Sequence, residues 1–101
     1  MTLNFATPFT SLEQTASGVE DGKVFGGQGF HYIAVQVDGI VATDIVQIEA
    51  KNHDDLTFVQ VGDDITADGV YAVEPGARYY RAAVTTAAGG GTITAVFTGS
   101  D

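Results

Sequence analysis

The sequence contains no cysteine and no tryptophan, and only two of its 101 residues are proline. Without cysteine the chain has neither disulfides nor thiolate metal ligands, and the redox compartment is left open. The fold must therefore be held by packing, by strand pairing, or by association with copies or partners. A chain of this length is expected to form one domain around one core.

Basic residues are also scarce, because four stand against thirteen carboxylates and the net charge is −9. Nucleic-acid binding needs a basic surface that displaces phosphate counterions. Binding to an anionic membrane is disfavoured for the same reason, because the chain is acidic. No apolar run approaches the roughly 20 residues of a membrane span. Residues 1–5 lack the basic region and apolar core of a signal peptide. We therefore expect synthesis in the cytoplasm without a signal peptide, and no nucleic acid or membrane as a partner.

Helical periodicity is missing as well, and thirteen glycines oppose helices. Instead, short alternating runs are separated by Gly, Asp and Asn clusters. In the clearest run, residues 30–37, Ile33, Val35 and Val37 share one face. Comparable runs cover residues 44–51, 56–61, 70–73, 78–86 and 92–98. Their spacing predicts an all-β fold, a small antiparallel β-sandwich or jelly-roll-like barrel of about seven or eight strands.

The first 20 residues predict an N-terminal arm or edge strand, followed by a β-sandwich domain over residues 21–101. Four large apolar residues stand in this weakly patterned segment: Leu3, Phe5, Phe9 and Leu12. Such side chains are costly to leave in water. We therefore predict that they bind a partner, lying along a neighbour's sheet edge by strand addition. The alternative is that the segment is the first strand of its own sandwich.

Candidate metal and catalytic residues form no convincing set. His31 and His53 are expected in a strand and a turn, whereas zinc needs three or four converging ligands. Turn carboxylates suggest calcium, but their order lacks the alternation of an EF-hand loop, and aspartate favours turns by itself. These carboxylates are Asp54, Asp55, Asp63, Asp64 and Asp68. No lysine-containing phosphate loop follows the glycines of residues 26–29. We expect no enzyme activity, no metal and no cofactor.

The most informative polar cluster is Arg78-Tyr79-Tyr80-Arg81. In a strand Tyr79 and Arg81 share one face, and Arg78 and Tyr80 share the other. Tyrosine beside arginine can stack on and hydrogen-bond a sugar or a partner protein, so Tyr79 and Arg81 are candidate partner-binding residues. The favoured alternative is structural, with Arg81 paired to a carboxylate such as Glu49.

Residues 46–97 contain two strings, T-x-x-G-x-Y-x-V at residues 66–73 and G-x-R-Y-x-R-x-x-V at residues 76–84. With the flanking segments at residues 48–55 and 89–96, they resemble small β-sandwich structural proteins of tailed phages. The resemblance implies a non-enzymatic virion protein, most of all one that decorates and stabilises the capsid. It also implies a homotrimer bound to the major capsid protein or another virion protein. The alternative is a small carbohydrate- or receptor-binding module of a tail or fibre.

Overall fold

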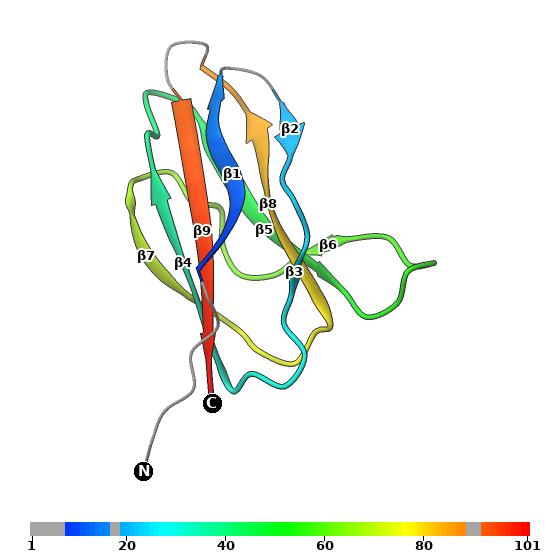
Figure 1. The fold of residues 1–101 in the computed structure, drawn as a ribbon. Coiled ribbons are helices and arrows are strands. Elements are labelled where there is room, and N and C mark those ends of the chain that lie inside the picture. Colours follow the sequence, from blue (N-terminus) through cyan, green and yellow to red (C-terminus); the bar gives the residue numbers. More distant parts are fainter. Residues whose placement is uncertain (1–7, 17–18, 89–91) are drawn as a thin grey trace.

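The computed structural model describes residues 8–16, 19–88 and 92–101. They form two antiparallel sheets that pack face to face, and no helix occurs among them (Figure 1). This arrangement confirms the predicted small antiparallel β-sandwich. The described residues contain nine strands, of which β2, β3 and β6 have only two residues each.

The two sheets have simple orders, and the chain passes repeatedly from one to the other. Sheet A contains, in spatial order, β1 (Phe9–Ala16), β9 (Thr92–Ser100), β4 (Tyr32–Asp38) and β7 (Gly69–Val73). Sheet B contains β2 (Glu20–Asp21), β8 (Tyr79–Thr86), β5 (Ile45–Lys51) and β6 (Val59–Gln60), and β3 (Phe25–Gly26) also pairs with β8. β1 and β7 are therefore the two edges of sheet A.

The alternation read from the sequence places the core correctly. On β4 every second residue is buried, and the same period holds on β5 and β9. Because successive strand residues point to opposite faces, each strand contributes one apolar row to the space between the sheets. The rows are Ile33, Val35 and Val37; Val46, Ile48 and Ala50; and Ile93, Ala95 and Phe97.

A bulge in β1 joins the two sheets through one side chain. The register with β9 shifts between Thr10 and Leu12, which leaves Ser11 at the irregular position. Ser11 is 4% exposed. Its Oγ donates a hydrogen bond to the carbonyl of Lys23 (2.8 Å) and accepts one from the N–H of Ala82 on β8 (3.0 Å). Edge strand β1 is thereby tied to sheet B as well as to sheet A.

The predicted strand over residues 56–61 is wrong for most of its length, since only Val59–Gln60 pairs, as β6. The connection from β5 to β6 projects sideways from the sandwich (Figure 1). Leu56 and Val59 are 57% and 62% exposed there. An alternating pattern makes a strand only where a second layer covers its apolar row, and this segment lies beyond that layer.

The segment predicted as an arm or edge strand is described only in part. Residues 9–16 form β1, an edge strand of sheet A, and residues 1–7 and 17–18 lie outside the described residues. The division of the chain at residue 20 stays a prediction.

Asp44 closes the turn before β5 and is 3% exposed. One carboxylate oxygen accepts the N–H of Ala88, and the other accepts the N–H of Val41 (3.0 Å). These backbone hydrogen bonds, that from Ala88 most of all, favour the charged form and lower the pKa of Asp44 below 3.8.

Replacing Ser11 by alanine is expected to destabilise the fold by about 1–3 kcal/mol, because the N–H of Ala82 and the carbonyl of Lys23 lose their partner. Urea unfolding measures the free energy. Thr10→Ala, a change in the same strand, is the control and should cost less. Equal losses in the two variants would show that the Ser11 bonds contribute little.

Replacing Asp44 by asparagine tests the pKa shift. Since the folded pKa lies below the unfolded value, the stabilising effect of Asp44 is complete above pH 3.8 and is lost as pH falls through the lowered pKa. We expect Asp44→Asn to be less stable than the wild type at neutral pH, with a difference that shrinks in acid. The unfolding free energies of the two proteins, measured from pH 7 to pH 2, give this difference, and Asp63→Asn at an exposed position is the control. A difference independent of pH would contradict the shift.

Candidate functional site

Two of the four apolar residues predicted to bind a partner lie in β1 and pack inside their own domain. Leu12 is 1% exposed in the core. Phe9 is half-buried, and its ring lies 5.7 Å from that of Phe25. Leu3 and Phe5 fall outside the described residues. Of the four apolar residues, Phe9 and Leu12 therefore pack within the domain, whereas Leu3 and Phe5 precede β1 in the sequence.

Tyr79 and Arg81, the other predicted candidates, lie on the outer face of sheet B. Arg81 donates to Glu49 on β5 through Nε (2.8 Å), and its Nη1 lies 3.5 Å from a carboxylate oxygen of Asp21 on β2. The pairing with Glu49 is the structural alternative drawn from the sequence. The side chains of Arg81 and Glu49 are only 22% and 16% exposed. Arg81 therefore links three strands of its own sheet.

The same arginine holds the projecting β5–β6 connection. Its guanidinium lies 4.1 Å from the ring centre of Phe58, and the Lys51 ammonium lies 4.7 Å from the same ring. Cations at these distances are attracted to an aromatic face. Phe58 is half-buried beneath them, so it offers little free ring surface for a ligand.

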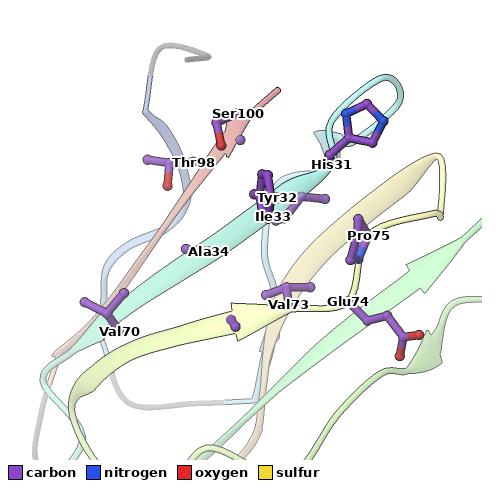
Figure 2. Close-up of a pocket in the computed structure, with 12 residues that line it drawn as sticks. His31, Tyr32, Ile33, Ala34, Val70, Val73, Glu74, Pro75, Thr98 and Ser100 are labelled. Carbon is purple, nitrogen blue, oxygen red and sulfur yellow. The ribbon is translucent and has the colours of Figure 1, made fainter. Parts of the chain in front are cut away.

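The outer face of sheet A is different, because it carries an open groove of about 690 Å³. Figure 2 shows residues from β4, β7, β9 and the segments that flank them around it. Its residues were not recognised as a site from the sequence. The available signal was the outward row of β4, where Tyr32 and Ala34 are apolar on the face opposite the core.

Strand register explains why this face is hollowed. Ala34 on β4 pairs with Ala72 on one side and with Thr98 on the other. Small side chains thus meet across three neighbouring strands. Larger apolar side chains rise beside them, since Tyr32 is 69% exposed and Val70 is 67% exposed. The groove has a low floor between apolar walls.

The chemistry of the groove suits apolar side chains better than a polar ligand. Its side-chain polar groups come from His31, Tyr32, Glu74, Thr98 and Ser100, which lie around it (Figure 2). A small-molecule site usually has polar groups converging at its centre. Exposed apolar surface of this kind is typical of contacts between proteins.

A smaller hollow of about 430 Å³ lies beneath the β5–β6 connection. The exposed Leu56 and Val59 line it, together with Val61 and Ala77. It gives the molecule a second apolar surface, on the opposite sheet from the groove.

The histidines and turn aspartates are spread apart. His53 Nδ1 accepts the N–H of Asp55 (3.1 Å), whereas His31 lies at the groove margin. Asp68 accepts the N–H of Ile40 (2.9 Å). No three His, Asp or Glu side chains gather as a metal site within residues 8–16, 19–88 and 92–101. In that same part of the chain, no helix is long and apolar enough to cross a membrane.

The fold and its surfaces define the class: a small β-sandwich with an apolar groove on one outer face. The crystal structure of the SPBc2 prophage-derived protein YomS has this fold, with a TM-score of 0.80. The match covers 100% of this chain and 96% of YomS, at 16% sequence identity. At that identity the likeness establishes the fold. No family model matches the sequence, and no curated protein matches it by sequence.

Replacing Arg81 by methionine keeps most of the side-chain volume but removes the charge that holds Glu49, Asp21 and Phe58. We expect a loss of about 1 kcal/mol in unfolding free energy and faster protease cleavage in residues 52–58. Arg78→Met is the matched control, because exposed Arg78 lies over the ring of Tyr79 (5.3 Å) and makes no ion pair within the described residues. Equal effects of the two substitutions would show that the contacts of Arg81 with Glu49, Asp21 and Phe58 do not stabilise this region.

Proposed function

We propose that this protein is a non-enzymatic structural component of a tailed-virus particle, and that it decorates and stabilises the capsid through protein–protein contacts. The observation that carries the proposal is the fold shared over the whole chain with a prophage-derived protein. The proposed partners are further copies of this chain and the major capsid protein or another virion protein. The proposed location is the assembled virion.

The surfaces of the sandwich support a role in assembly. Its two apolar hollows lie on opposite sheets, so one copy has surface for two different neighbours. A decoration protein needs this arrangement, because it contacts both its own copies and the shell beneath. The net charge of −9 keeps such a protein soluble before assembly and limits non-specific contacts.

The alternative of a carbohydrate- or receptor-binding module has less support. It was based on Tyr79 and Arg81, and Arg81 is occupied by Glu49, Asp21 and Phe58. A sugar site needs an exposed aromatic face with free polar groups around it. Here the ring of Phe58 already lies against two cations.

Binding to shells tests the proposal directly. We expect the gene to lie among capsid, portal and terminase genes, and the purified protein to sediment with shells assembled from the capsid protein of the same genome. Leu56→Asp combined with Val59→Asp should weaken this binding at least about tenfold, since it places charge on an exposed apolar surface.

Val19→Asp is the matched control, because Val19 is 73% exposed and lies outside both hollows. A glycan array should give no binding. Wild-type protein that ignores the shells, or that binds one glycan specifically, would overturn the decoration role.

A further inference from the structure

We propose that the groove on the outer face of sheet A receives residues 1–7 of a second copy of this chain, with Leu3 and Phe5 as the anchoring side chains. The inference rests on the self-association in the proposed function, and it adds the site and its occupant. It is tested on purified protein without shells, so it can fail while shell binding stands.

The groove and the segment match in chemistry. The groove floor is formed by Ala34 and Ala72, and its walls include the exposed Tyr32 and Val70. In an extended chain Leu3 and Phe5 point to the same side, about 7 Å apart. Two apolar anchors on one side of a strand fit an open apolar groove that spans several strands.

Charge selects this segment over the remainder of the chain. Residues 1–12 contain no charged side chain, whereas the remaining residues hold all thirteen carboxylates and all four basic groups. Two domains with a net charge of −9 repel each other on approach. An uncharged segment crosses to an acidic neighbour without adding to that repulsion, and Glu74 at the groove margin would disfavour an acidic one.

β1 begins beside the end of sheet A that carries the groove, whose lining includes Thr98 and Ser100. Phe9 pairs with Phe97, and β9 ends at Ser100. Residues 1–7 precede this point in the sequence, and disulfide trapping distinguishes the groove of a neighbour from their own.

The contact joins a segment of one copy to the groove of another, so the two surfaces differ. Such contacts join unlike surfaces of successive copies, and they form a ring when the rotation between copies closes. A trimer, the oligomer implied by the phage resemblance, is one such ring.

Two full-length variants test the contact by complementation. Leu3→Ser with Phe5→Ser removes the anchors and keeps the groove, whereas Ala72→Glu blocks the groove and keeps the anchors. Sedimentation equilibrium should show self-association of the wild type, weakened at least about a hundredfold in each variant. An equal mixture of the two variants should associate again, because one intact anchor meets one intact groove. Val19→Glu should associate like the wild type.

Disulfide trapping identifies the occupant, and it is clean because the chain has no cysteine of its own. Phe5→Cys mixed with Ala72→Cys should give a covalent dimer containing one chain of each, well above the yield with Val19→Cys. A single chain that carries both Phe5→Cys and Ala72→Cys is the further test. Three results would overturn the proposal: a monomeric wild type, a variant mixture that stays monomeric, or a double-cysteine chain that forms only an intrachain disulfide. The last would place the segment in its own groove.

Discussion

The sandwich depends on a row of aromatic rings that spans the space between its sheets. The ring of Phe25 on β3 lies 5.2 Å from that of Phe97 on β9 and nearly parallel to it, at 3°. The ring of Phe30 also stacks on that of Phe25, at 5.9 Å, and the ring of Phe9 on β1 lies 5.7 Å from that of Phe25. Tyr80 on β8 completes the row beside Phe97 at 6.5 Å. Since these rings come from both sheets, they supply the cross-sheet packing that a chain without disulfides needs.

This row also decides which apolar residues remain for a partner. Phe9 packs against Phe25, and Leu12, three residues further on, is buried in the core. The bonds of Ser11 to the backbone of both neighbouring segments hold the same strand in place. Of the four apolar residues predicted to bind a partner, Leu3 and Phe5 stay candidates, because they precede β1. The outer face of sheet A, with Tyr32 and Val70 exposed, is the surface proposed for them.

The apolar periodicity predicted much of the fold because burial on one face imposes a period of two. The buried rows of β4, β5 and β9 fall on the predicted residues, and Arg81 meets Glu49 as the structural alternative required. The same rule failed for residues 56–61, where apolar residues also recur at every second position but Leu56 and Val59 are exposed and only Val59–Gln60 pairs. The groove was missed because it arises from cross-strand register: Ala34, Ala72 and Thr98 are far apart in the sequence and adjacent in the sheet.

The sequence by itself determined the all-β class, the alternating strands, the acidic surface and the uncharged apolar N-terminal segment, because these follow from composition and local period. Only the tertiary structure decided the order of strands in each sheet, the aromatic row, the burial of Phe9 and Leu12, and the groove between β9, β4 and β7. Each of these results from pairing between segments distant along the chain, and alternation fixes which face a residue occupies without fixing which strand lies beside it.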